Sequence, residues 1–326
     1  ALVWFGVGIA AAAEPEVPAV PTEPSVARAE VRPTVLILRR ATANMDSFVR
    51  GMVGELGDAF DVDAVVVGRD TTVTTLGTAI GDRSPAVIVI LDNPTAELYR
   101  AYQEAFPDRP TPPAVIAMAL FVEQTAQRIR NATGIAYEVP AVTSFGRLRA
   151  TVASPVIRVG VVYRPAFGAF VAAQTRLASI EGFEIVPFEL DARPGLGQVR
   201  AGLKSLDKLD VDALWVLNDN VLLTPELLVG AWLPLMRRSD RPVVVGVSSL
   251  LKTQPPVGSF AVLPDHESLG MQAAEMIFEL RDAGWSVGAT PPQLPIAVET
   301  VLNLPFTERT TGVRAGAIDE VDQVIP

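Results

Sequence analysis

Two apolar segments of similar character each open a series of alternating elements. The first runs from Thr34 to Leu38, and the second, from Val156 to Val162, contains a single charged side chain, Arg158. Both segments are short and rich in β-branched residues, which predicts strands rather than helices. Because polar residues do not alternate along them, each strand is expected to be covered on both faces, as in a parallel sheet. The pattern therefore predicts an α/β protein built from two similar halves.

Segments with helical periodicity follow the strands in both halves. The clearest spans Asp265 to Asp282, where apolar residues recur at helical spacing. Asn44 or Asp46 is expected to cap the helix that follows the first strand. The acidic tail, residues 316–326, is expected to contain a short helix. This alternation of strands and helices is typical of βαβ units.

The first 33 residues are expected to lie outside the folded part of the chain. Residues 1–13 are uncharged and apolar, and they are too short to span a bilayer, which takes about 20 residues. They end in small residues, as the apolar region and cleavage site of a secretory signal do. Residues 14–33 contain repeated prolines among small and acidic residues, which predicts an extended tether. We therefore expect an exported protein.

Composition excludes several classes of site. The chain has 326 residues, of which 49% are hydrophobic and 20% charged, as in globular proteins. A net charge of -10 argues against a nucleic-acid partner, which would need clustered Lys and Arg. The absence of cysteine excludes disulfides, thiolate metal sites, a cysteine nucleophile and a lipid-modified cysteine. A single histidine, His266, excludes multi-histidine metal sites, and no G-x-G-x-x-G motif follows either strand. No cofactor and no metal are expected.

Side chains directly after the strands are the candidate ligand contacts. In open parallel sheets ligands bind outside the carboxyl ends of the strands. In the first half, the candidates at these positions are Arg39, Arg40, Asn44, Asp92 and Met118. If Met118 faced a ligand cleft between the two halves, it would make the first half's side of that cleft apolar. Strand residues of this kind more often belong to the hydrophobic core.

The second half carries a more polar set of candidates. They are Tyr163, Arg164, Asn218, Asp219, Asn220 and Ser248. Arg164 offers a guanidinium that can hold a carboxylate through two hydrogen bonds, and Asp219 offers a carboxylate for a ligand ammonium or hydroxyl. The alternative is that the residues around Asp219 only form an Asx turn or cap the next helix, and Ser248 is equally a helix cap.

Several blocks of sequence, in order, resemble one known family. The blocks are TGIAYEVPA (133–141), RVGVVYRP (158–165), VDALWVLNDN (211–220), RPVVVGVSS (241–249), GSFAVLPDHESLGMQAAEMI (258–277), the strand around 301–304, and DEVDQVI (319–325). Together they resemble the periplasmic substrate-binding proteins of ABC importers, in the subgroup that includes putative tryptophan and tyrosine binders. The resemblance covers roughly the C-terminal 60% of the chain.

The resemblance implies a type I periplasmic-binding-protein fold, in which two Rossmann-like lobes joined by crossing strands close on a small molecule. Residues 34–140 plus 263–292 would form the first lobe, and residues 141–262 plus 293–326 the second. Asp265 and His266 join the candidate contacts, at the rim of the cleft or at the hinge. His266 stands where the family carries an aromatic residue. The implied partners are a small ligand (an amino acid, an aromatic or a lipid-like compound) and an ABC permease in the inner membrane, with the protein in the periplasm.

Three functions remain open from the sequence. The leading one is the solute-binding component of an ABC transport system. The second is a ligand sensor with the same fold, which signals without transport. No residue of this chain distinguishes it from the transport component. The third is a two-lobed hydrolase or epimerase that uses His266 with Asp265 or Asp219 as acid and base.

Overall fold

The computed structural model describes residues 32–326, which fold around two separate sheets. The first sheet has the strand order β2-β1-β3-β4-β5, and all of its strands are parallel. Its strands are β1 (Thr34–Arg39), β2 (Asp61–Val66), β3 (Val87–Leu91), β4 (Ala114–Ala117) and β5 (Ala132–Gly134). The predicted signal segment, and all but the last two residues of the predicted tether, lie outside the described residues.

The second sheet repeats the first and extends it. Its order is β12-β11-β10-β9-β8-β6-β7, so β6 to β10 have the same order as β1 to β5, and β11 is antiparallel to β10. The strands are β6 (Arg158–Tyr163), β7 (Glu184–Glu189), β8 (Ala213–Val216), β9 (Val243–Val245), β10 (Phe260–Pro264), β11 (Val298–Asn303) and β12 (Gln323–Ile325). This order is one of the two common doubly wound arrangements. The prediction of two similar α/β halves is confirmed.

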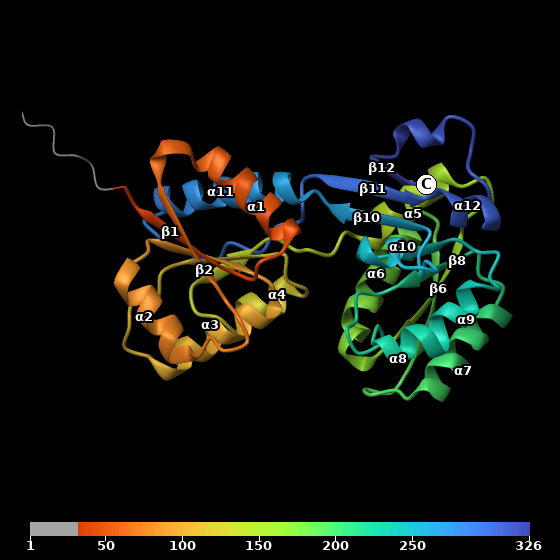
Figure 1. Ribbon diagram of the computed structural model, residues 1–326, viewed down its shortest axis with the longest axis horizontal. Helices are drawn as coiled ribbons and strands as arrows, with labels where there is room; N and C mark the ends of the chain where they lie inside the picture. The colour runs from red at the N-terminus through yellow and green to blue at the C-terminus, as the bar shows by residue number, and fades with distance from the viewer. Residues whose placement is uncertain (1–31) are drawn as a thin grey trace, which may run out of the picture. The chain divides into compact units, whose positions relative to one another are not determined.

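Helices cover the sheets, and we call each sheet with its helices a lobe (Figure 1). The helices of the first lobe are α1 (Ala43–Leu56), α2 (Val73–Arg83), α3 (Asn93–Ala105), α4 (Val122–Gln127) and α11 (His266–Asp282). The helices of the second lobe are α5 (Ala141–Thr151), α6 (Gly168–Ile180), α7 (Leu196–Lys208), α8 (Pro225–Leu227), α9 (Leu233–Met236), α10 (Ser249–Lys252) and α12 (Leu304–Thr310). Among residues 32–326, no helix combines the length and the apolar character needed to cross a membrane.

Each central strand is buried on both faces, as its uninterrupted apolar sequence predicts. Along β1, Val35 and Ile37 belong to one apolar core, and Leu36 and Leu38 belong to another on the opposite face. All four side chains are fully buried. Successive residues of a strand point to opposite faces, so an apolar run without alternation requires two layers of helices.

Helix α11 returns from the C-terminal half of the chain to the first lobe, where it lies beside α1 (Figure 1). The two backbones approach closely at glycines on both helices. A Cβ atom on Gly51 would lie 2.0 Å from the carbonyl oxygen of Glu267, and one on Gly270 would lie 2.0 Å from the carbonyl oxygen of Phe48. The crossing therefore depends on the absence of side chains at these two positions.

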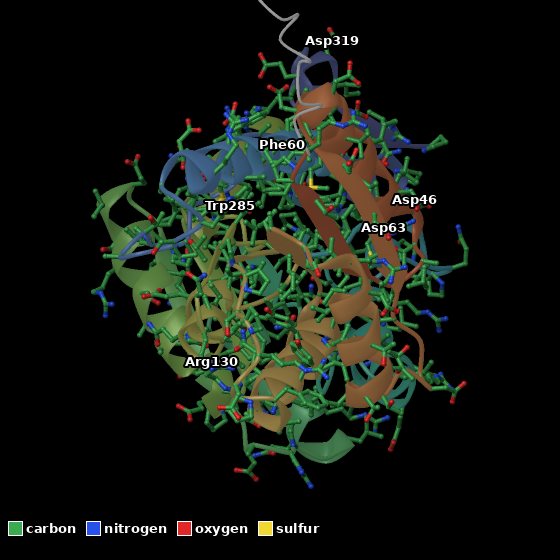
Figure 2. The ribbon with its side chains drawn as sticks, turned by 90° about the vertical axis from the view of Figure 1, so that its left-hand side faces the viewer. Asp46, Phe60, Asp63, Arg130, Trp285 and Asp319 are labelled. Atoms are coloured by element: carbon green, nitrogen blue, oxygen red, sulfur yellow. The ribbon has the colours of Figure 1, made fainter. Side chains whose placement is uncertain are left out.

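A second contact holds the end of α11 to the same lobe. Phe60, just before β2, and Trp285, just after α11, are labelled in Figure 2, and their ring centroids are 6.4 Å apart at an edge-on angle of 82°. Edge-to-face rings at this separation attract one another. The first lobe is therefore assembled from segments far apart in the sequence.

The chain passes between the two sheets three times, after β5, from β10 into α11, and before β11. Hydrogen bonds join these crossing segments to one another. Ile135 forms a bridge with Gln293, and the amide of Asp265 donates to the carbonyl of Ala297 at 3.1 Å. The crossings therefore form one connected strip rather than three free linkers.

The structure corrects two local predictions and extends a third. Thr42, rather than Asn44 or Asp46, caps α1, because its hydroxyl accepts from the amide of Met45. Arg39 is the last residue of β1 rather than part of the loop after it. The tail contains the expected short helix, a 3₁₀ turn at Ala317–Glu320, but it ends in strand β12, which was not expected, because the sequence alone does not reveal that β11 lies beside it.

Candidate functional site

In both lobes an arginine–aspartate pair spans the point where the strand order reverses. In the first lobe, Arg40 follows β1 and Asp92 follows β3, and Arg40 Nε lies 2.5 Å from Asp92 Oδ2. Asp92 also caps α3 by accepting from the amide of Thr95 at 2.8 Å. The side chain of Arg40 is 54% exposed and that of Asp92 is 8% exposed. The pair therefore has one end in water.

The corresponding pair of the second lobe is buried. Arg164 follows β6 and Asp219 follows β8, and the guanidinium binds both carboxylate oxygens, with Nε at 2.7 Å and Nη2 at 2.8 Å. The side chain of Arg164 is 14% exposed and that of Asp219 is 2% exposed. Arg164 Nη1 also donates to the carbonyl of Ala192, and Asp219 accepts from the amide of Val221, which is the Asx turn considered from the sequence. The two side chains that were expected to hold a zwitterionic ligand therefore bind each other.

A cavity of about 50 Å³ lies at the carboxyl ends of β8 and β9. Leu217, Asn218 and Gly246 line it directly after these strands. Residues 137–139 of the first crossing segment, together with Leu120 of the loop after β4, also contribute to the lining. Ligands of open α/β sheets bind at this edge of the sheet, so the cavity is the candidate binding site.

Four aromatic rings contribute to the wall of the cavity. Tyr137, Phe167, Phe170 and Trp215 all line it, although only 6% of the chain is aromatic. The rings of Phe170 and Trp215 are tilted against each other, with centroids 5.9 Å apart. The cavity is therefore built to receive an apolar or π-binding group.

Glu138 connects the cavity to a strained loop of the first lobe. Its Oε1 accepts from the amide of Phe121 at 2.6 Å, and burial raises the pKa of the carboxyl group above its ordinary value. Phe121 and Met118 both adopt left-handed backbone angles, with φ of 55° and 54°. Residues other than glycine hold such angles only where the surroundings impose them. Here Asn93 contributes as well, since its side-chain amide bonds both backbone groups of Leu120, at 2.7 and 2.8 Å.

The ring of Phe121 reaches the second lobe. Its centroid lies 4.8 Å from that of Phe167 and 5.9 Å from that of Phe170, in edge-on contacts. Because Phe167 and Phe170 line the cavity, the conformation of the loop at Phe121 and the shape of the cavity depend on each other.

His266 belongs to the crossing segments. Its Nε2 lies 2.9 Å from the hydroxyl of Tyr137. Burial lowers the pKa of His266, against a smaller opposing effect of the Asp265 charge, and burial raises the pKa of Tyr137 to about 12, with the charge of Glu299 adding to it. Both shifts favour neutral side chains, so the hydroxyl and a neutral imidazole share one hydrogen bond, whose direction is set by the tautomer of His266. Asp265 caps α11 by accepting from the amide of Ser268 at 2.7 Å.

The other predicted residues lie apart from the cavity lining. Asn44 is exposed on the first turn of α1, and Met118 packs against the core of the first lobe. The hydroxyl of Tyr163 donates to Glu189 at 3.1 Å. Asn220 is exposed, and Ser248 precedes α10 without a capping hydrogen bond from its side chain. Of the predicted contacts, Asn218 lines the cavity.

Sequence reasoning missed most of the cavity wall. Glu138 stands alone among apolar residues between two strands, and a single carboxylate in such surroundings is a usable signal of a buried acid. Phe170 and Trp215 lie inside a helix and a strand, where aromatic residues are usually core. Within residues 32–326, no group of His, Asp and Glu side chains is arranged to hold a metal ion.

Comparison with known proteins identifies the fold. No protein-family model matches the chain, and no curated protein matches its sequence. A substrate-binding protein with adhesive properties from Clostridium difficile, in a ligand-free open form, matches with a TM-score of 0.65 and 18% identity, over 90% of this chain and 99% of that one. An ABC domain in complex with L-Trp from Streptococcus pneumonia matches with a TM-score of 0.58 and 17% identity, over 90% of this chain and all of the other. A conserved domain protein from Vibrio cholerae gives 0.57 and 16%, over 90% and 99%.

These matches extend over nearly the whole of each chain, so they concern the complete pair of lobes and not one α/β half. Together with the repeated strand order and the three crossing segments, they show that the chain has the two-lobed fold of type I periplasmic binding proteins.

Proposed function

We propose that this protein is the exported solute-binding component of an ABC transport system. It binds a small organic ligand between its lobes and carries that ligand to a permease in the membrane, and it performs no chemistry on it. The observation that carries the proposal is the aromatic cavity at the carboxyl ends of β8 and β9, which Leu120 and residues 137–139 complete. A ligand that touches all of these groups stabilises one arrangement of the lobes over others, and such differential contact drives hinge closure.

The arrangement of acids and bases supports binding rather than catalysis. Asp219 is held by Arg164, and His266, the only histidine of the sequence, is bonded to Tyr137. An acid–base pair needs each group to reach a reacting atom, and here both groups are engaged by protein partners.

Native mass spectrometry of the full chain purified from its own host tests the proposal. We expect a co-purified small molecule. A thermal-shift screen complements it, because a ligand at one hundred times its Kd stabilises the folded state by about 2.7 kcal/mol. Loss of uptake of the same compound in cells that lack the protein would establish the transport step.

A cavity-filling variant provides the control for the location of the site. Gly246 lines the cavity, and a Cβ atom there would lie 3.4 Å from Cβ of Asn218, an ordinary contact. Gly246→Leu is expected to abolish the ligand-induced shift. Gly54→Leu adds the same side chain on an open face of α1, where a Cβ meets nothing within 4 Å, and should leave the shift unchanged. Equal shifts in both variants would place the ligand elsewhere.

A further inference from the structure

The lining of the cavity carries charge of one sign only. Glu138 is the one carboxylate side chain in the lining, and the lining contains no Lys, Arg or His. The remaining polar side chains there, Ser144 and Asn218, are neutral, and the rest are aromatic or aliphatic apart from Gly246 and Pro264. A ligand that bears a carboxylate would therefore meet no positive side chain in this cavity.

The charge of Glu138 is not neutralised by the protein. One carboxylate oxygen accepts from the backbone amide of Phe121, but none of the ion pairs found in residues 32–326 includes Glu138. Burial disfavours the ionised form, as the raised pKa of this group reflects. A cation placed in the cavity would remove that penalty.

Arg40 and Arg164, the arginines that follow β1 and β6, are each paired within their own lobe, and neither lines the cavity. Arg164 uses Nε and Nη2 on Asp219 and Nη1 on the carbonyl of Ala192. Arg40 is paired with Asp92. Separating the buried Arg164–Asp219 pair would leave two unpaired charges out of contact with water, which costs free energy.

The aromatic walls suit a positive charge. The faces of Trp, Tyr and Phe rings attract ammonium groups, and all three ring types line the cavity beside Glu138. The volume of about 50 Å³ corresponds to about four water-sized groups, at roughly 10–15 Å³ for each. That is room for an ammonium head with small substituents, while the rest of the ligand would have to extend beyond the cavity.

On the basis of the proposed function, we infer that the ligand is an organic ammonium ion without a carboxylate, whose cationic head lodges against Glu138 within the ring of Tyr137, Phe167, Phe170 and Trp215. This differs in charge from L-Trp, the zwitterion bound by the similar Streptococcus pneumonia domain. The geometry assigns the cation-binding role to Glu138 rather than to Asp219.

Four probes that differ in charge test this inference with the full chain by isothermal titration calorimetry. Tyramine, L-tyrosine and 4-hydroxyphenylacetate share one ring and are a cation, a zwitterion and an anion, and choline is a quaternary ammonium ion. We expect heat of binding for tyramine or choline and none for the other two. The affinity for the cation should rise with pH as Glu138 ionises, over a range above that of an unperturbed Glu carboxyl, because burial raises its pKa.

Glu138→Gln separates charge from structure, because its amide oxygen still accepts from the amide of Phe121. Affinity for the cation should fall by about tenfold or more, and the pH dependence should disappear. Glu55→Gln is the matched control: it makes the same change at an exposed position of α1, and Glu55 does not line the cavity. This variant should bind as the parent does.

The outcomes also distinguish this inference from the proposed function. Binding of L-tyrosine or 4-hydroxyphenylacetate in preference to the cations, or an uncharged or anionic solute co-purified with the protein, would overturn the ligand class and leave the binding function standing. Cation affinity unchanged in Glu138→Gln would overturn it as well. Failure of all four probes, with no co-purified solute, would overturn both.

Discussion

Asp219→Ala removes the carboxylate that holds Arg164 in the second lobe. In the intact protein Asp219 accepts three hydrogen bonds, from Nε and Nη2 of Arg164 at 2.7 and 2.8 Å and from the amide of Val221 at 2.9 Å. Alanine leaves the guanidinium with only the carbonyl of Ala192, and it leaves the amide of Val221 without this acceptor. We expect the free energy of unfolding to fall.

The magnitude follows from burial. Removing one partner of a buried ion pair costs about 3–5 kcal/mol, and because the side chain of Arg164 retains 14% exposure, we expect the low end, about 3 kcal/mol. Asp92→Ala is the matched comparison, since Arg40 is 54% exposed and stays hydrated. Its main loss is the cap on Thr95, about 1 kcal/mol. The same chemical change should therefore differ by about 2 kcal/mol between the lobes.

Urea unfolding, followed by tryptophan fluorescence and circular dichroism, measures both variants. Trp215 and Trp232 are buried in the second lobe and report on it. A double-mutant cycle of Arg164→Met and Asp219→Asn isolates the pair, because asparagine can still accept from the amide of Val221. We expect the double variant to be more stable than the sum of the single losses predicts. A coupling energy below about 0.5 kcal/mol, or equal losses in Asp219→Ala and Asp92→Ala, would refute the reasoning.

Three further predictions concern the crossing helices and the hinge. Gly270→Ala should destabilise the folded state by about 1–3 kcal/mol, since its Cβ would overlap the backbone of Phe48. Gly54→Ala, in open space on α1, should stabilise it by about 0.5–1 kcal/mol. Similar thermal melts for the two variants would contradict the close approach of α1 and α11. The pKa of His266 is lower in the folded state than its ordinary 6.5, so the unfolded state binds more protons and stability should fall as the pH drops below about 6.5. His266→Gln should lose less stability than the parent between about pH 7.5 and about pH 5, and parallel urea midpoints would count against this assignment. Tyr137→Phe should cost about 1 kcal/mol at neutral pH, through loss of the bond to His266, and no change in the urea midpoint would show that the bond contributes nothing.

The fold was predictable because its signals are local. An uninterrupted, β-branched apolar run as short as Val87–Leu91 is typical of a strand covered on both faces. The apolar spacing within His266–Asp282 is typical of a helix wherever it packs. The tail shows the limit of this reasoning. Gln323–Ile325 forms a strand because β11 lies beside it. The sequence of these three residues does not predict that pairing.

The candidate site was predictable in position but not in pairing. Asn218 and Asp219 were expected at the end of a strand, and they lie there. Whether Asp219 contacts a ligand or Arg164 depends on which strands are neighbours and on whether the two side chains can reach each other. Neither can be derived from a single segment of sequence. Glu138 was overlooked for the same reason, since its importance arises from rings contributed by a helix and a strand of the other half.

The close approach of α1 and α11 has a consequence for how the protein can be made. The face of α1 that Gly270 covers stays bare until about residue 282 has left the ribosome, so a nascent chain cannot finish its first lobe before most of the second has been synthesised. A fragment that ends near residue 140 would therefore expose an apolar helix face. To produce that lobe alone, a gene would have to be rearranged to join the segment from β1 to β5 directly to α11.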